Sequence, residues 1–469
     1  MKLSVKEKAS YGLGAVGKDM VYALSATYVL YYYNDLLHIN PLAMGAILLF
    51  ARVFDAFNDP IMGVIVAKTR TRWGKFRPWL MIGTLLNSIF LILMFAVPAN
   101  FSGSSLVAYA AVMYIMWGVT YTMMDIPYWS MVPAFTEPGQ DRENVSALAR
   151  SCAGVGSALI QIFSMMIVYA LGAIGLDTAS VASSVVEVNG FKYLAIIVAV
   201  LFIAFITITC LNIKETSTVE MQTASVGDMF RALIQNDQAM TVVIAIVLVN
   251  TAFYVTSNLV IYFFKYDFGG ADWYQNYTLF NMFGGGMQII SMMVFFPLLR
   301  KFFAATRLFK VALGSSMCGY LVLLAIASLT NMSNVYILFV PGFFIFVANG
   351  VLTVLTTIFL ANTVDYGELK NGRRDESVIF SMQTFVVKLA SGVAAMIATI
   401  CLQIFSISSE NVEESTATIA HSSAVGLRMT MTILPIIGLV IAFTVYSRRY
   451  KLTESRIQEI SSELKARKG

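Results

Sequence analysis

Long apolar segments separated by short polar ones run along the whole chain. A segment of about 20 mostly apolar residues can cross a bilayer as a helix, and the pattern predicts twelve such helices. They cover residues 11–36, 41–67, 78–99, 105–134, 147–174, 191–212, 239–265, 273–299, 308–329, 334–363, 377–405 and 425–447. The runs are continuous, whereas strands of a membrane β-barrel would show short segments of alternating polarity. We therefore predict an all-α integral membrane protein with twelve transmembrane helices.

Basic residues gather in every second connection between the predicted helices. Of the 32 Lys and Arg residues, 25 lie at the N-terminus, in these connections or in the C-terminal tail, and residues 68–77 form the densest group. Only Lys192, Lys265 and Arg428 lie near the opposite side. Because positively charged connections stay in the cytoplasm, both termini are expected to be cytoplasmic.

The longest cytoplasmic connection, residues 213–238, follows the sixth predicted helix and divides the chain into two halves of six. We predict an N-terminal six-helix bundle at 1–212, a C-terminal six-helix bundle at 239–447 and a cytoplasmic tail at 448–469. Two six-helix halves are the layout of carriers of the major facilitator type.

The tail places Ile457, Ile460 and Leu464 on one face of a helix. It is expected to lie on the membrane or to dock under the bundle, and a solvated tail is an equal alternative.

Composition narrows the function classes. The residues Ala, Val, Ile, Leu, Met, Phe, Trp, Tyr and Cys make up 58% of the chain and charged residues only 13%, whereas soluble domains carry about 25% charged residues. A soluble enzyme, a nucleic-acid-binding protein and a disordered chain are therefore disfavoured. The four cysteines are far apart in apolar stretches, and there are only two histidines. Neither a disulfide framework nor a metal centre of Cys or His is indicated.

A few ionisable side chains fall inside the predicted spans. Each costs about 2.5–3.5 kcal/mol at the bilayer centre, so the set needs compensation of roughly 20 kcal/mol. They are Lys18, Asp19, Arg52, Asp55, Asp59, Asp125, Arg150 and Lys388. Positive and negative charges are equal in number, and mutual pairing in a polar cavity is the simplest explanation. The alternative is that these charges pair only to stabilise the fold. For Arg52, one turn before Asp55, a structural role and a functional role are nearly equally supported.

The second span has the most specific pattern. Asp55, Asn58 and Asp59 lie on one helix face, and burial makes it costly to ionise two neighbouring carboxylates. A hard cation relieves the repulsion, because carboxylate and amide oxygens suit such ions. Sodium fits a transporter that must release its ion, and protonation of one carboxylate is the alternative. Thr122 of the fourth span could supply another oxygen.

The fourth span carries a second polar face. Tyr121, Asp125 and Trp129 lie one turn apart along it. A carboxylate accepts hydrogen bonds from sugar hydroxyls, and an aromatic ring covers the apolar face of a sugar. Lys18 and Arg150 can donate to hydroxyls or balance the carboxylates.

The C-terminal half offers a smaller polar set. Gln383, Thr384 and Lys388 share one face of the eleventh predicted helix, and they are the main polar side chains there.

Motifs along nearly the whole chain add a resemblance. They are SYGLGAVGKD (10–19), ARVFDAFNDPIMG (51–63), TRWGKFRPW (71–79), WGVTYTMMDIPYWSMVP (117–133), NDQ (236–238), TVDYGE (363–368) and SMQTFVVK (381–388). In these motifs the sequence strongly resembles the glycoside–pentoside–hexuronide cation symporters and, among them, the melibiose carriers. The resemblance implies the major facilitator fold and a bacterial cytoplasmic membrane location.

The resemblance also implies residue roles. The cation site would comprise Asp55, Asn58, Asp59 and Thr122. The sugar would contact Lys18, Asp19, Tyr121, Asp125, Trp129 and Arg150, with Gln383, Thr384 and Lys388 facing the same cavity. The sequence departs from the melibiose carriers at Thr353, where they have tryptophan, and at Asn362, where they have an acidic residue. Loss of the tryptophan is expected to change which second sugar unit fits, and Asn362 to alter gating contacts.

Together these observations predict a secondary active symporter. It would couple inward movement of Na⁺, or of Li⁺ or H⁺, to uptake of a galactoside, with a monomer sufficient and no cofactor or nucleic acid needed. No segment reads as a P-loop, so ATP drive is not expected. A sodium-coupled carrier of a pentoside, glucuronide or lysolipid is the alternative. An intramembrane metal-dependent prenyltransferase is remote, because it would need two acidic clusters.

Overall fold

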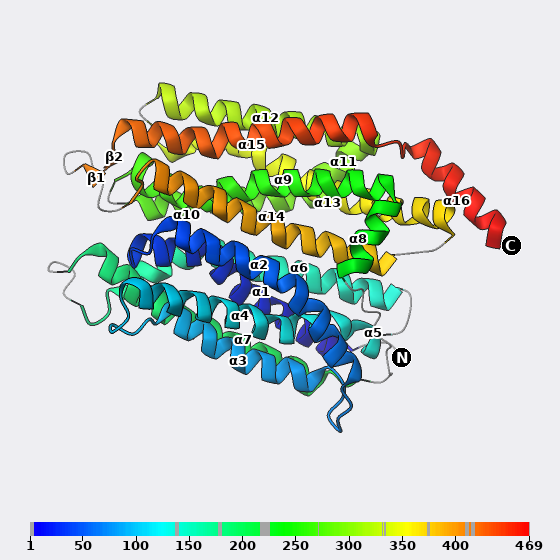
Figure 1. Ribbon diagram of the computed structural model, residues 1–469, viewed down its shortest axis with the longest axis horizontal. Coiled ribbons are helices and arrows are strands. Elements are labelled where there is room, and N and C mark those ends of the chain that lie inside the picture. Colours follow the sequence, from blue (N-terminus) through cyan, green and yellow to red (C-terminus); the bar gives the residue numbers. More distant parts are fainter. Residues whose placement is uncertain are drawn as a thin grey trace. The chain divides into compact units, whose positions relative to one another are not determined.

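In the residues that it describes, the computed structural model consists of helices and one short hairpin, joined by loops (Figure 1). It describes residues 4–136, 140–176, 181–215, 226–270, 272–330, 332, 334–372, 376–408, 412–413 and 418–468. The chain divides into two compact units, Met1–Thr223 and Ala224–Gly469. The division falls inside the connection expected at 213–238.

The first unit is a bundle around α1. Its elements are α1 (Val5–Tyr31), the π-helical η1 (Tyr32–Leu36), α2 (Pro41–Lys68), α3 (Arg77–Phe95), α4 (Gly103–Ser130), the short α5 (Val132–Phe135), α6 (Gln140–Gly172) and α7 (Ser183–Asn212). Helix α1 packs against α6 and α7, and α4 packs against α2 and α3. The helix starts are encoded locally, since Ser4 and Glu7 form a capping box and Asn40 caps α2 in front of Pro41.

The second unit is organised around α9 and α13. Its elements are α8 (Val226–Gln235), α9 (Asp237–Tyr262), η2 (Phe263–Phe268), α10 (Trp273–Ile290), η3 (Ser291–Phe295), α11 (Phe296–Arg300), α12 (Ala305–Leu329), η4 (Val335–Leu338), α13 (Phe339–Asn371), α14 (Glu376–Ile404), β1 (Val412–Glu413), β2 (Thr418–Ile419), α15 (His421–Arg449) and α16 (Glu454–Lys468). Helix α9 packs against α14 and α15, and α13 packs against α10 and α12. The two strands pair antiparallel, with Val412 opposite Ile419.

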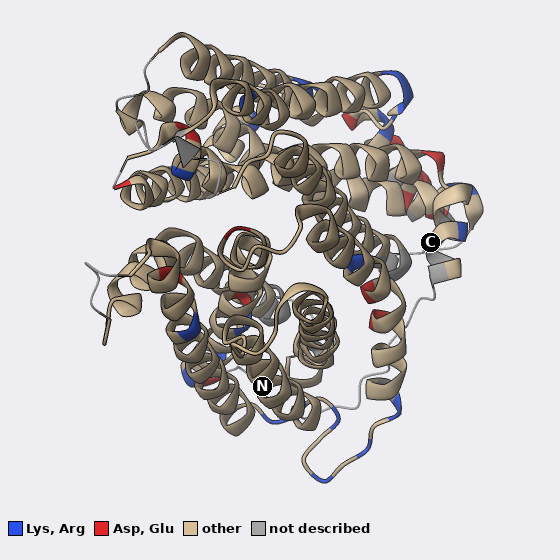
Figure 2. Cartoon of the chain, turned by 60° about the vertical axis from the view of Figure 1, so that its left-hand side comes forward, with Lys and Arg blue, Asp and Glu red and all other residues tan. Residues whose placement is uncertain are grey.

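Within the described residues, 11 helices are long and apolar enough to cross a membrane. Helix α1 is of similar length, 27 residues, but Lys18 and Asp19 in its middle lower its hydropathy. With α1 the total agrees with the twelve predicted spans, and the all-α membrane fold is confirmed. Figure 2 shows Lys and Arg concentrated at helix ends and in connections, with few charges along the helices.

Most predicted spans match a helix, and the start of the sixth is one of the two largest differences in position, the other being the end of the tenth, where α13 continues to Asn371. The sixth was expected to begin at 191, but α7 begins at Ser183. The polar Glu187 interrupts the apolar run, yet its carboxylate is fully buried and accepts hydrogen bonds from Tyr31 and Tyr169. A buried carboxylate with such partners lies inside a helix bundle without disrupting it.

Part of the connection expected at 213–238 is helical in the described residues. Residues Val226–Gln235 form α8, and Asp237 and Gln238 already belong to α9. Helix α8 is only 10 residues long and far too short to register as a membrane span. It packs against α9 and α14, so its stability comes from that contact.

The tail docks on its own unit. Leu452, Ile460 and Leu464 are buried together, and Tyr366 and Leu369 of α13 pack against them. Of the alternatives for the tail, docking is therefore the one that the structure shows. The predicted apolar face of α16 is the face that is covered.

Candidate functional site

The ammonium group of Lys18 is the centre of a polar cluster in the first unit. Its Nζ lies 2.7 Å from Asp125 Oδ1 and 3.2 Å from Asp19 Oδ2, and it donates a hydrogen bond to the hydroxyl of Tyr121 at 3.2 Å. Lys18 is only 3% exposed, so its charge is compensated almost entirely by these groups. Helices α1 and α4 thus bring together four of the predicted sugar-site residues.

Trp129 extends this cluster. Its indole Nε1 donates to Asp125 Oδ1 at 3.2 Å, and the guanidinium carbon of Arg150 lies 4.1 Å from a Trp129 ring centroid. Lys18 Nζ is 5.0 Å from the same residue's ring. We call Lys18, Asp19, Tyr121, Asp125, Trp129 and Arg150 the α4 sugar cluster. Its two cations and two carboxylates sum to zero charge.

The cluster is only partly covered. The side chains of Asp19 and Asp125 are 18% and 29% exposed, and Arg150 is exposed. The Oδ2 of Asp19 is buried and lies 3.2 Å from Lys18 Nζ. The cluster therefore presents carboxylate oxygens to a polar ligand.

The predicted cation-site residues also lie together. Thr122 Oγ1 donates to Asp59 Oδ1 at 2.9 Å. A Cβ on Gly118 would lie 3.2 Å from Asp55 Oδ1, so Asp55 faces the bare backbone of α4. Asn58 shares this face of α2, and its Nδ2 is buried with no hydrogen-bond partner among the described residues.

We call Asp55, Asn58, Asp59 and Thr122 the α2–α4 cation cluster. Arg52 lies beside it. The Nη1 of Arg52 is 3.4 Å from Asp55 Oδ2, and its guanidinium lies within 6 Å of the rings of Tyr22 and Tyr114. Arg52 is 6% exposed. In the described residues no group of three or more His, Cys, Asp or Glu side chains could hold a metal ion. The α2–α4 cation cluster instead offers oxygens from two carboxylates, one amide and one hydroxyl.

Three contributors were not found from the sequence. Gly118 provides the close approach at Asp55, Tyr22 flanks Arg52, and Trp117 stacks on Tyr121 with ring centroids 5.4 Å apart. A signal existed for Gly118, because it lies four residues before Thr122 and hence on the same face of α4. Aromatic residues in a membrane helix are too common to be singled out by type alone.

Helix α4 joins the two clusters. Thr122 contacts Asp59 in one cluster, and Asp125, three residues later, contacts Lys18 in the other. Residues three apart on a helix are neighbours, so the two contacts lie on the same turn of α4.

The predicted residues of the other half lie on α14, in the second unit. Gln383 and Lys388 are half-buried and Thr384 is exposed. Thr353, the position that departs from the melibiose carriers, is exposed on α13, and its hydroxyl donates to the carbonyl of Asn349.

The family model described as "MFS/sugar transport protein" matches residues 10–454. The chain belongs to this family. The protein is therefore a multi-pass transporter of the bacterial cytoplasmic membrane and not an enzyme.

Curated relatives match the transporter along nearly its whole length. The uncharacterized symporter YjmB of Bacillus subtilis (strain 168) is 27% identical, covering 99% of this chain and 96% of the relative. The lactose permease of Lactobacillus delbrueckii subsp. bulgaricus is 26% identical, covering 100% and 74%. The raffinose carrier protein of Pediococcus pentosaceus is 25% identical, covering 97% and 70%.

Solved structures support the fold of the transporter. A bacterial homologue of the human lysosomal transporter Spinster matches with a TM-score of 0.64 and 12% identity, covering 95% of this chain and 96% of that one. A D-xylose–proton symporter matches with a TM-score of 0.62 and 13% identity, covering 93% and 96%.

Proposed function

We propose that the transporter is a cation-coupled symporter that takes up a glycoside, with Na⁺ as the principal coupling ion and a galactoside as the principal substrate. The observation that carries the proposal is the placement of an oxygen-rich cluster and a mixed-charge aromatic cluster on the same turn of α4. Relatives named symporter, lactose permease and raffinose carrier support it, since lactose and raffinose both contain a galactosyl unit.

The α2–α4 cation cluster favours a monovalent ion. With both carboxylates ionised, Asp55, Asp59 and Arg52 together carry one net negative charge. A bound Na⁺, Li⁺ or proton brings this group to neutrality, which burial favours. Oxygen donors from Asp55, Asp59 and Thr122 suit a hard ion, and rotation of the Asn58 amide presents its oxygen instead of its nitrogen.

The α4 sugar cluster favours a neutral glycoside. Its charges are balanced, so an anionic glucuronide would leave an uncompensated charge in a partly buried site. Asp19 and Asp125 can accept hydrogen bonds from hydroxyls, and Lys18 and Arg150 can donate them. The indole of Trp129 offers an apolar face for a sugar ring. A lysolipid needs a slot for an acyl chain, and this cluster of charged groups argues against one.

Coupling follows from the shared turn of α4. A cation bound at Asp59 competes with the hydrogen bond that Thr122 donates there, and this shifts the turn that carries Asp125. Ligand binding at two sites that bias the same element is cooperative in both directions. In the second unit, Gln383, Thr384 and Lys388 of α14 are the residues proposed to contact the sugar.

Uptake of radiolabelled α-galactosides into right-side-out vesicles, with and without a sodium gradient, tests the proposal. We expect sodium-stimulated uptake by the wild type and by Asp272→Asn, which alters an exposed carboxylate at the start of α10. Asp125→Cys should lose all uptake. Asp59→Cys should keep downhill exchange but lose sodium stimulation. Absence of galactoside uptake under every gradient contradicts the substrate proposal, and a screen of pentosides and glucuronides would then decide the cargo.

A further inference from the structure

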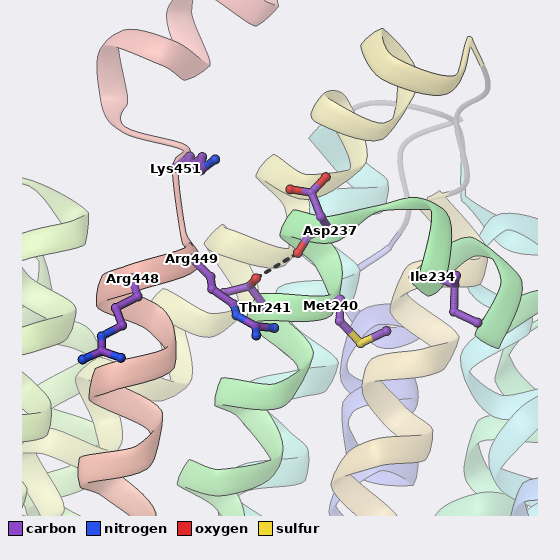
Figure 3. Close-up of a pocket in the computed structure, with 7 residues that line it drawn as sticks. All are labelled: Ile234, Asp237, Met240, Thr241, Arg448, Arg449 and Lys451. Atoms are coloured by element: carbon purple, nitrogen blue, oxygen red, sulfur yellow. Dashed lines mark hydrogen bonds between the residues drawn. The ribbon is translucent and has the colours of Figure 1, made fainter.

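A basic hollow lies in the second unit, and none of the residues that line it belongs to the two clusters. It has a volume of about 390 Å³ and is lined by Ile234, Asp237, Met240, Thr241, Arg448, Arg449 and Lys451 (Figure 3). Three cations and one carboxylate line it, so it is electropositive. We infer that this hollow, which we call the α9–α15 pocket, binds the phosphate of an anionic phospholipid headgroup.

The position of the pocket in the chain matches headgroup depth. Arg448 and Arg449 are the last residues of α15, directly after its apolar span, and Asp237 is the first residue of α9. Both helix ends lie on the side that the distribution of basic residues marks as cytoplasmic. Basic residues at that depth attract anionic lipids, and basic pockets between membrane helices bind their headgroups.

The carboxylate in the pocket does not neutralise its cations. Asp237 Oδ1 lies 2.5 Å from Lys370 Nζ and accepts from the Tyr366 hydroxyl at 3.0 Å, and its Oδ2 accepts from Gln238 at 2.7 Å. Figure 3 shows its side chain directed away from the guanidinium of Arg449. Its charge is therefore compensated from α13, outside the pocket.

Arg449 is the central ligand in this arrangement. Its guanidinium lies in the groove between α15 and α9, beside Thr241 and Met240, while Arg448 extends along the other side of α15 and Lys451 lies above (Figure 3). All three basic side chains are exposed, so their long stems can turn toward a phosphate. A guanidinium binds phosphate oxygens in pairs, and Ile234 and Met240 offer apolar contact for the glycerol and upper acyl chain.

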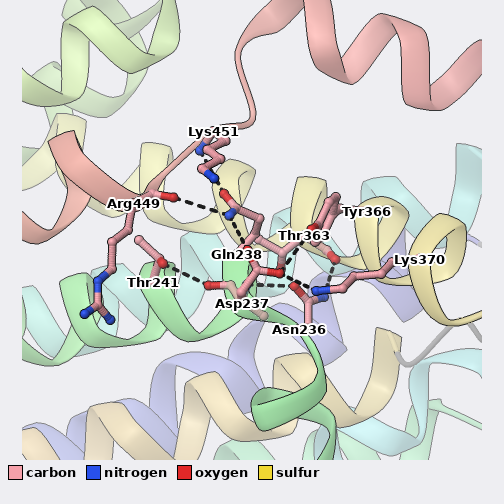
Figure 4. A network of polar contacts seen from close by, with 10 residues as sticks. Asn236, Asp237, Gln238, Thr241, Thr363, Tyr366, Lys370, Arg449 and Lys451 are labelled. Carbon is pink, nitrogen blue, oxygen red and sulfur yellow. Dashed lines mark hydrogen bonds and ion pairs between the residues drawn. The ribbon is translucent and has the colours of Figure 1, made fainter.

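A buried network holds the pocket in shape (Figure 4). Gln238, which is 2% exposed, accepts from the backbone N–H of Lys451 at 2.8 Å and donates to the carbonyl of Arg449 at 3.3 Å. Asn236 caps α9 through the N–H of Ala239 and donates to the Thr363 carbonyl. The NDQ motif thus fixes the connection between α15 and α16 to α9 and ties the start of α9 to α13, so the pocket exists before any ligand arrives.

Lipid binding to the purified full-length transporter in detergent tests the inference. Native mass spectrometry would count phosphatidylglycerol and phosphatidylcholine bound during titration. We expect one phosphatidylglycerol to bind in preference to phosphatidylcholine, with affinity falling roughly fivefold in Arg449→Gln and more than tenfold in the Arg448→Gln, Arg449→Gln, Lys451→Gln triple variant. Arg449→Lys keeps the charge but loses the paired donors of the guanidinium, so its affinity should lie between those of wild type and Arg449→Gln.

The control removes the same charge elsewhere in the unit. A Lys301→Gln, Arg307→Gln, Lys310→Gln variant changes basic residues on α12 and just before it, outside the pocket lining, and should bind within twofold of wild type. Equal losses in the two triple variants would overturn the inference, because binding would then follow total charge. Titration of inorganic phosphate separates the sources of the ligand. If inorganic phosphate binds to the pocket and phosphatidylglycerol does not, the ligand is a soluble phosphate and not a lipid.

Should the pocket triple variant fail to fold, Arg449→Gln and Arg449→Lys still decide the matter, because they differ in charge at one exposed position. Thermal unfolding, monitored by circular dichroism of the helices, checks the fold of every variant. None of these readouts requires transport, so the outcome does not depend on the proposed substrate or ion.

Discussion

At the scale of single residues, the site depends on short contacts between groups that are costly to bury. Lys18 is nearly fully buried because two carboxylates and a phenol compensate it, and Asp55 lies against a glycine and beside Arg52. Removing one member of such a group leaves another uncompensated, which destabilises by more than the contact contributes. Substitutions that keep the charge are therefore the informative ones.

Gly118→Ala tests the approach of α4 to the carboxylate of Asp55. The new methyl would lie 3.2 Å from Oδ1, so the carboxylate must move by a few tenths of an ångström. We expect about a threefold to tenfold loss of Na⁺ affinity, about 1 kcal/mol, in Na⁺-dependent sugar-binding assays. Gly154→Ala on α6 has open space at its Cβ and is the matched control. Equal affinity in both variants would remove Gly118 from the site.

Trp129→Phe tests the indole N–H. Phenylalanine keeps an aromatic face but cannot donate to Asp125 Oδ1, which Trp129 contacts at 3.2 Å. A hydrogen bond to a charged group contributes about 1.5–3 kcal/mol, so sugar affinity should fall about tenfold or more while the Na⁺ affinity of the sugar-free protein stays unchanged. Calorimetric titration measures both. A parallel loss of Na⁺ affinity would indicate a structural role instead.

At the scale of elements, helix ends are tied by carboxylates from distant segments. Glu215, after α7, accepts the backbone N–H groups of Lys75, Phe76 and Arg77 at 2.7, 2.9 and 3.0 Å. These are otherwise unpaired donors at the start of α3, where the helix dipole also favours an anion. The basic connection before α3 is thus held by an acceptor that lies about 140 residues away along the chain.

Glu215→Ala should expose that arrangement. It removes acceptors from the start of α3, and we expect a loss of about 1–2 kcal/mol in the free energy of unfolding, seen as a lower Tm in thermal unfolding. Glu215→Gln keeps one oxygen acceptor, so its Tm should lie between those of wild type and Glu215→Ala. Glu459→Ala, on the exposed face of α16, should leave the Tm unchanged. A Tm for Glu215→Ala equal to that of wild type would contradict the capping role.

The docking of α16 should weaken in acid. The carboxylate of Glu454 accepts the backbone N–H of Ala305 at 3.1 Å and pairs with Arg300 at 2.8 Å, and both lower its pKa from 4.5. A lowered folded-state pKa means that the stabilisation is complete above the unfolded pKa and is lost as pH falls through the folded one.

Hydrogen exchange in α16 measured from pH 6 down to pH 3 checks this expectation. Protection should fall below about pH 4.5 in the wild type, and Glu454→Gln should start from lower protection and show less dependence on pH. Protection that is the same at all pH values in the wild type would show that the apolar contacts of Leu452 and Ile460 alone hold the helix.

At the scale of the whole molecule, apolar runs of span length predicted the membrane fold and nearly every long helix, because a bilayer requires them. The pattern missed α8, which is short. It placed the start of α7 at 191 instead of Ser183, because Glu187 interrupts the apolar run and its partners Tyr31 and Tyr169 come from elsewhere in the chain. The cost of burying charged side chains in the membrane pointed to the charged residues of both clusters, and helical spacing pointed to their polar and aromatic neighbours. Gly118 and the pairing of Arg52 with Tyr22 and Tyr114 depend on how helices pack, which one sequence does not reveal.

The central claim is that the two clusters on α4 are energetically coupled, and calorimetric titration of the purified transporter with a galactoside, with and without Na⁺, tests it most directly. We predict that Na⁺ raises galactoside affinity by about 5–150-fold, the usual range of such coupling, and that the sugar raises Na⁺ affinity by the same factor. Asp59→Cys should bind the sugar with an affinity that Na⁺ no longer changes. Galactoside affinity that is identical with and without Na⁺ in the wild type would contradict the account.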